Sequence, residues 1–288
     1  LFIVVLMGVE YLFGWRLLLA PWATLSMTEI GSALTLLVAS YLFRAQRIAC
    51  YFRRISPTTV RFLPTVRLVL LHNCLNNLLP TRTGEISFPV LVRRYFGIDL
   101  VTSVPALLWL RFMDMHTLAL IGLIGLSGLR PAFLLPGLLL ALLWLPLPAV
   151  LLIAQPRVTR WAQRHDESRL AHLAQRLIAG LPHQCGHLFQ LWGYTLINWV
   201  AKIIAFAWVL HLFAEIALLP SLFGAVTGDM TSVLPFHGFA GAGSYEAGVM
   251  AGLALFGIAV EKGLPAAVNL HLFVLGGSFL GVIPALMI

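Results

Sequence analysis

Long runs of apolar residues, separated by short polar or broken stretches, dominate this chain. A helix that crosses a membrane needs about 20 mostly apolar residues. Runs near or above that length occupy roughly residues 2–20, 27–43, 102–127, 131–153, 188–214 and 265–287. The pattern therefore predicts an all-α, polytopic helical membrane protein.

Two further apolar segments are interrupted, each at a proline and a glycine-containing stretch. Pro80 breaks the first and Pro235 breaks the second, and no half is long enough to span. Paired segments broken by Gly and Pro, one in each half of a chain, are typical of transporter binding sites. We expect two re-entrant hairpins, within 66–96 and 221–258, hinged at these prolines. With them, the single domain 1–288 has about six to eight membrane segments in an inverted-repeat-like arrangement.

Two basic stretches, 44–67 and 154–186, separate groups of apolar runs. The first contains no acidic residue but six arginines: Arg44, Arg47, Arg53, Arg54, Arg61 and Arg67. Because cytoplasmic loops are enriched in Arg and Lys, we expect both stretches on the cytoplasmic side. The second predicts a surface helix on the lipid headgroups, or an arm for a cytosolic or membrane partner.

Composition excludes several classes of protein. Hydrophobic residues make up 60% of the 288 positions and charged residues 10%, whereas soluble domains carry about 25% charged residues. The formal net charge is +8, but the basic residues lie mostly between apolar runs, so nucleic acid is not an expected partner. His183 and His187 have helical spacing for a metal, yet no third ligand is evident. We expect neither a metal nor a cofactor.

A few charged residues fall inside or beside the apolar segments: Glu85, Arg111, Asp114, Lys202, Asp229 and Glu246. Each costs about 2.5–3.5 kcal/mol at the centre of a bilayer, so we expect most to be paired or functional. Arg111 and Asp114 share a helix face at i,i+3 spacing. A broken helix also exposes backbone N–H groups that attract a phosphate, and glycine allows a close approach. The alternative is that the charges are structural ion pairs that fix helix register.

The sequence resembles the lysylphosphatidylglycerol synthase transmembrane region family, a flippase-like integral membrane domain, from about residue 30 to 288. The resemblance rests on Asn76–Glu85 with Arg93, Gly97 and Arg111–Asp114, on Ser40–Arg47, and on Leu234–Gly241 with Gly243 and Glu246. The second motif departs from the family pattern at Phe236 and His237. We recognise no aminoacyl transferase domain and expect a stand-alone member.

The resemblance implies a protein of the bacterial inner membrane that binds or moves lipids. We predict a midplane cavity that binds the headgroup of a phospholipid or a polyprenyl- or glycolipid. Its predicted residues are Asn77, Arg82, Gly84, Glu85, Arg111, Asp114, Gly243 and Glu246. Arg82 and Arg111 would contact the phosphate, and the acids would orient these arginines or meet a cationic headgroup. Candidates for proton or charge coupling are Glu85, Glu246, Lys202 and His237.

We expect a transporter rather than an enzyme. The main partners of this transporter are expected to be membrane lipids with anionic phosphate headgroups. Two other classes stay open. One is a membrane-embedded transferase or lyase acting on a lipid-linked substrate, with Glu85 or Glu246 as general base. The other is a scaffold for a cytosolic partner of envelope biosynthesis, held through 154–186.

Overall fold

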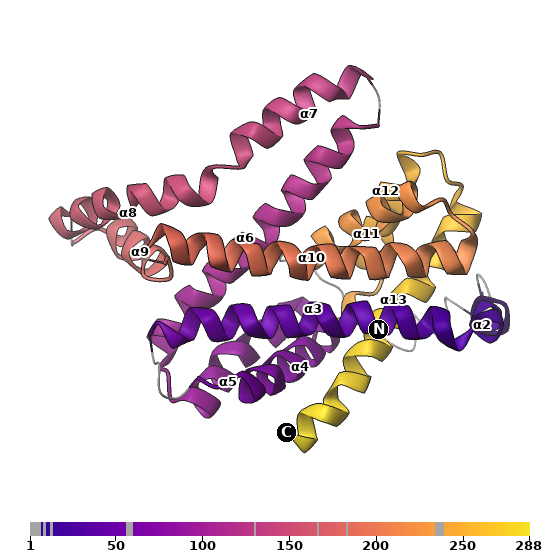
Figure 1. Ribbon diagram of the computed structural model, residues 1–288, viewed down its shortest axis with the longest axis horizontal. Coiled ribbons are helices and arrows are strands. Elements are labelled where there is room, and N and C mark those ends of the chain that lie inside the picture. Colours follow the sequence, from indigo (N-terminus) through magenta and orange to yellow (C-terminus); the bar gives the residue numbers. More distant parts are fainter. Residues whose placement is uncertain are drawn as a thin grey trace. The chain divides into compact units, whose positions relative to one another are not determined.

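Figure 1 shows a computed structural model of the chain, which is helical throughout its described parts. It describes residues 7, 10, 11, 14–55, 60–129, 131–165, 167–182, 184–233 and 239–288, with only the backbone of residues 80–82, 233 and 239. Every regular element in these ranges is an α-helix or a 3₁₀-helix. The predicted all-α fold is therefore confirmed.

Four helical stretches of the described residues are long and apolar enough to cross a membrane. They are Leu100–Ser127, Pro131–Arg164, Cys185–Ala214 and Val260–Met287. Helices α2 (Trp15–Thr24) and α3 (Met27–Arg53) would add a fifth as one span, although they are bent by 96° at their junction. The expected six to eight segments also counted the two interrupted ones, whose helices are shorter. The expected run at 2–20 lies mostly outside the described residues.

Two expected boundaries need correction. Helix α3 continues to Arg53 instead of ending near residue 43. Arginine, alanine and glutamine all favour helix, so the basic stretch ends the apolar run without ending the helix. The expected span 131–153 continues to Arg164 as a candidate span, within which lie two helices, α7 (Pro131–Trp144) and α8 (Leu147–Arg164). Pro146 separates them, since proline cannot donate the backbone hydrogen bond that would continue α7.

The chain forms two compact units. Unit 1 comprises Leu1–Leu42, Val69–Glu85 and Asn198–Ile288, and unit 2 comprises Phe43–Leu68 and Ile86–Ile197. The remaining elements of unit 1 are the end of α4 (Phe62–Leu78), η1 (Pro80–Ile86), the end of α10 (Cys185–Ala214), α11 (Leu218–Val233), η2 (Phe239–Gly241), α12 (Ser244–Ala254) and α13 (Val260–Met287). Those of unit 2 are the start of α4, α5 (Ser87–Phe96), α6 (Leu100–Ser127), α7, α8, α9 (Arg169–Ile178) and the start of α10.

Side-chain hydrogen bonds tie the helices of unit 1 to α13. The Asn269 side chain accepts from Trp22 Nε1 at 2.7 Å and donates to the Leu18 carbonyl at 2.9 Å, which joins α2 to α13. The Asn73 amide donates both to the Tyr41 hydroxyl and to the Ser278 hydroxyl, which joins α4 to α3 and α13. Because polar groups in an apolar interior are costly unless paired, these bonds fix the helix register.

The second interrupted segment is a helical hairpin in which α11 packs along α12 (Figure 1). Two glycines of α12, four residues apart, allow this close approach. A Cβ atom on Gly252 would lie 2.5 Å from the Phe223 carbonyl oxygen, and one on Gly248 would lie 2.8 Å from the Thr227 oxygen. Small residues at this spacing bring membrane helices together. At 16 and 11 residues, both helices are shorter than a usual span.

In unit 2, helices α6 and α7, which follow one another in the sequence, pack against each other (Figure 1). His116 Nε2 donates to the Trp144 carbonyl at 3.0 Å, and Trp144 Nε1 donates back to the His116 carbonyl at 3.2 Å. Gly137 of α7 packs closely on Ser127 of α6, where a Cβ atom would lie 2.9 Å from the serine Cβ. Most other side chains of α7 are exposed leucines.

Helix α9 is amphipathic and lies in the expected basic stretch 154–186. Leu170, Leu173 and Leu177, at i, i+3 and i+7, are all exposed, while Ala171 is buried. Arg169 is the first residue of the same helix, and Arg176 lies in its last turn. An exposed leucine face with flanking arginines is typical of a helix that lies in the membrane interface.

Candidate functional site

A buried charge cluster lies in unit 2, on α3, α6 and α10. The Asp114 carboxylate accepts two hydrogen bonds from Arg47, with Nη1–Oδ1 2.6 Å and Nη2–Oδ2 3.3 Å. Arg47 Nη1 also donates to the Thr195 hydroxyl at 3.0 Å. Both charged side chains are almost inaccessible, at 3% and 1% exposure. Such two-point pairing of guanidinium and carboxylate is the strong form of a hydrogen-bonded ion pair.

Arg111 approaches the same carboxylate from the preceding turn of α6. Its Nη1 lies 3.5 Å from Asp114 Oδ2, and its side chain is 21% exposed, far more than that of Arg47. Arg44, also buried, acts electrostatically on Asp114. The cluster thus brings three guanidinium groups to one carboxylate, with Arg111 as the accessible member. A guanidinium has five N–H donors, so one such group can contact a carboxylate and an anion at the same time.

A second buried pair lies in unit 1, at the start of α12. Glu246 Oε1 is 2.6 Å from His271 Nδ1 on α13, and Glu246 Oε2 accepts from the Gly243 N–H at 2.8 Å. His271 Nε2 lies 2.8 Å from the Ala240 carbonyl oxygen. Glu246 is the third residue of α12, so its bond to Gly243 is the reciprocal half of a capping box.

Lys202 and Asp229 form a third pair, also in unit 1. Lys202 Nζ on α10 donates to Asp229 Oδ1 on α11 at 2.7 Å, and both side chains are buried. The ammonium also lies 4.9 Å from the ring centroids of Trp199 and Phe206, within the range of cation–π attraction. Pairing offsets the cost of placing these two charges on apolar helices.

The first interrupted segment places Gly84 and Glu85 in η1, against the end of α4. A Cβ atom on Gly84 would contact Asn76 and lie 2.5 Å from the Leu75 carbonyl oxygen, so only glycine fits there. Glu85 Oε2 is 3.9 Å from His72 Nε2. Asn77, predicted to bind substrate, donates its amide to Ser278 at 2.7 Å.

The predicted site residues thus fall into separate groups. Arg111 and Asp114 lie together in unit 2; Gly243 and Glu246 lie together in unit 1, where Asn77, Gly84, Glu85 and Lys202 also lie. Pro80 begins η1, and the Arg82 side chain, Pro235 and His237 are outside the described residues. The common headgroup cavity stays a prediction.

Four pairings were not predicted: Arg47 with Asp114, His271 with Glu246, His72 with Glu85 and Lys202 with Asp229. The signal for His271 was present, because an ionisable residue inside a membrane helix usually faces a partner. Arg47 lies in the basic stretch 44–67, whose composition predicts a cytoplasmic loop and therefore no buried partner.

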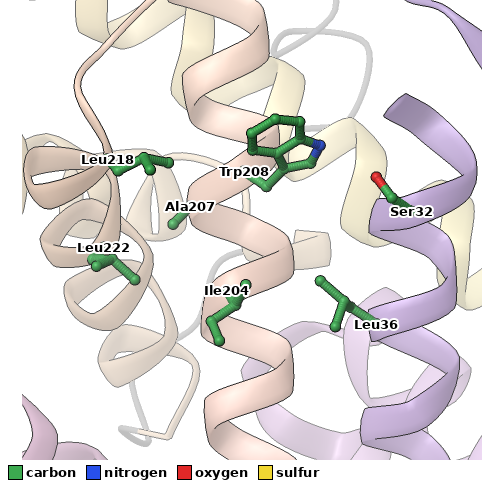
Figure 2. A pocket seen from close by; sticks show the side chains of 7 residues that line it. All are labelled: Ser32, Leu36, Ile204, Ala207, Trp208, Leu218 and Leu222. Atoms are coloured by element: carbon green, nitrogen blue, oxygen red, sulfur yellow. The ribbon is translucent and has the colours of Figure 1, made fainter. Parts of the chain in front are cut away.

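An apolar groove of about 280 Å³ lies on unit 1 between α3, α10 and α11 (Figure 2). Leu36, Ile204, Ala207, Leu218 and Leu222 line it. Figure 2 shows the Trp208 ring and Ser32 together toward one end of the groove. Walls of this kind suit a hydrocarbon chain rather than a polar ligand.

The helical spans and the buried charges define a polytopic membrane protein that contains ion pairs buried among its helices. Residues 1–281 match the family described as "Lysylphosphatidylglycerol synthase TM region", and the chain belongs to this family. The family indicates a membrane protein of lipid metabolism or transport. No curated protein and no solved structure matches the chain significantly.

Proposed function

We propose that this protein binds the phosphate-bearing headgroup of a membrane lipid and moves it between leaflets of a bacterial inner membrane. The observation that carries the proposal is the cluster of Arg47, Arg111 and Asp114 inside apolar helices. Ionisable groups at such places mark substrate pathways in membrane proteins. Membership of a family that indicates lipid metabolism or transport supports a lipid as the substrate.

Arg111 binds the phosphate in this proposal, and Arg47 with Asp114 positions it. Arg111 is the accessible guanidinium, and its fork of donors matches two phosphate oxygens. Asp114 is already neutralised by Arg47 at 2.6 Å, so it holds Arg111 without cancelling its charge. A phospholipid and a polyprenyl- or glycolipid phosphate share this chemistry.

Two other features support a lipid substrate. The groove lined by Leu36, Ile204 and Leu222 suits a lipid hydrocarbon chain. The exposed leucines and arginines of α9 suit contact with anionic headgroups at the cytoplasmic surface. Lipid movement needs no bond to break, so the proposal is a transporter and not an enzyme.

Proteoliposomes that contain fluorescent phosphatidylglycerol, with a membrane-impermeant quencher added outside, test the proposal. Wild-type protein is expected to exchange label between leaflets, and Arg111→Gln is expected to lose most of that exchange while melting close to wild type. Arg94→Gln is the matched control, because Arg94 is exposed on α5. Equal exchange by wild type, Arg111→Gln and empty vesicles would refute the proposal.

Mass spectrometry of the recovered lipid separates transport from catalysis in the same vesicles. Transport leaves the mass of the labelled lipid unchanged, whereas a transferase or lyase changes it. A protein-dependent new lipid mass would replace the transporter by the enzyme alternative.

A further inference from the structure

The two ring nitrogens of His271 both face oxygen atoms that serve as acceptors. Nε2 lies 2.8 Å from the Ala240 carbonyl oxygen, which can only accept, so Nε2 carries a hydrogen and donates it. Nδ1 lies 2.6 Å from Glu246 Oε1. At that distance a hydrogen must lie between the two atoms, because two lone pairs would repel each other. Glu246 and His271 therefore share one proton.

The proton count of the pair follows from this geometry. With the shared proton, the pair is an imidazolium with a carboxylate or an imidazole with a carboxylic acid, and either form has zero net charge. Without it, a neutral imidazole turns the Nδ1 lone pair toward a carboxylate, and the net charge is −1. Both side chains are nearly buried, at 9% and 13% exposure, so water screens this repulsion poorly.

In the described part of the chain, no further charged side chain forms an ion pair with Glu246 or His271. Tyr245 of α12 places its ring centroid 4.9 Å from that of His271. Asp229 of α11 is already bonded to Lys202 of α10. Arg16 of α2, a helix that packs on α13, is exposed. The charge of the Glu246–His271 pair is therefore set by the proton.

The pair also holds an unusual backbone turn in place. Ala240 has φ +53°, a left-handed conformation that is rare for a residue with a side chain, and Gly241 and Gly243 also have positive φ. His271 bonds to the carbonyl of Ala240, and Glu246 bonds to the N–H of Gly243. The turn at 240–243, which leads into the broken helix, is thus fixed at both ends by the same two side chains.

We propose that Glu246 and His271 form a proton-binding site that holds the turn 240–243 while protonated and releases it when the proton leaves. One proton binds between Nδ1 and Oε1, and the same proton departs to solvent on release. Chains of Glu and His inside membrane helices carry protons in pumps and transporters. The use of this site to drive lipid movement rests on the proposed function.

Hydrogen exchange of the peptide 239–247 in detergent or nanodiscs tests the site without any lipid assay. The protection factor, corrected for intrinsic exchange, is expected to fall about tenfold from low pH, where the shared proton is bound, to high pH, where it has left. Constant wild-type protection over this range would overturn the proposal.

Two variants and a control sharpen this measurement. Glu246→Gln keeps an oxygen for the Gly243 N–H and supplies an N–H for His271 Nδ1, so it imitates the protonated pair and is expected to stay protected throughout. His271→Gln cannot titrate and is expected to show one pH-independent level. His172→Gln, exposed on α9, is expected to follow wild type. A Glu246→Gln profile that falls with pH as wild type does would overturn the proposal.

An imposed pH gradient across the proteoliposomes links the site to lipid movement. The rate at which wild type exchanges fluorescent phosphatidylglycerol is expected to change with the gradient. The rate for His271→Gln is expected to be independent of the gradient. The same gradient dependence in both would overturn the coupling. If wild type moves no lipid but the hydrogen-exchange transition persists, the proposed function fails and the proton-binding site stands.

Discussion

The Asp114 carboxylate is the counter-charge on which the unit 2 cluster depends, so Asp114→Asn is the most informative perturbation of stability. The change keeps the size of the side chain but removes the charge that faces Arg47 at 2.6 Å and Arg111 at 3.5 Å. Removing one partner of a buried ion pair costs about 3–5 kcal/mol, because the other charge stays buried. We expect a loss near the lower end, about 3 kcal/mol, since the partly exposed Arg111 can turn toward water.

Thermal unfolding in detergent, followed by the loss of monodisperse protein, measures this effect. A cost of about 3 kcal/mol corresponds to a decrease in Tm of roughly 6–12 °C for a protein of this size class. The double variant Arg47→Met, Asp114→Leu replaces both charges by apolar groups and is expected to recover much of the loss. Glu167→Gln is the surface control, because that carboxylate is exposed.

Two results would contradict this role of Asp114. If Asp114→Asn melts within about 2 °C of wild type, Asp114 does not neutralise a buried charge. If the double variant loses as much stability as Arg47→Met and Asp114→Leu added together, Arg47 and Asp114 act independently and the pair is not the structural unit described above.

Two further changes test local structure. Gly84→Ala places a Cβ atom 2.5 Å from the Leu75 carbonyl oxygen and is expected to lower stability by about 1–3 kcal/mol through overpacking. Gly31→Ala is the control, because a Cβ atom there has no atom within 4 Å, and it is expected to be neutral or stabilising. Equal melting temperatures of the two variants would contradict the packing at Gly84. Hydrogen bonds from the Thr102 side chain and backbone hold the pKa of the Asp99 carboxyl below its ordinary value. The Tm advantage of wild type over Asp99→Asn should therefore be full above the ordinary value of about 3.9 and disappear as pH falls through the lower folded value, while a pH-independent gap would refute it.

The helices and their interruptions could be predicted because both depend on neighbouring residues. Apolar runs of sufficient length indicated the spans, and Pro80 with Gly84 indicated where α4 would give way to η1. The glycine series before Glu246 likewise predicted that α12 begins after a break. The boundary near residue 43 was wrong because hydropathy reports the end of an apolar surface and not the end of a helix.

The partners of the buried charges could not be predicted, because they depend on how helices pack. Asp114 lies 67 positions from Arg47 along the chain, and Glu246 lies 25 positions from His271. A single sequence reveals i,i+3 neighbours such as Arg111 and Asp114, but it holds no direct record of pairs between helices. The sequence did carry one overlooked signal, the four-residue spacing of Gly248 and Gly252, which is typical of closely packed membrane helices.

Helix α7 has a consequence for how this protein can change over evolutionary time. Its leucines are exposed, and hydrocarbon accepts leucine, isoleucine, valine or phenylalanine almost equally well. Related sequences can therefore drift along that surface with little selection, so long as it stays apolar. Gly137 and Ala141 face the opposite demand, because both are buried and Gly137 presses against Ser127. Among related sequences, we expect positions 137 and 141 to keep small residues, while the other positions of α7 vary freely among apolar residues.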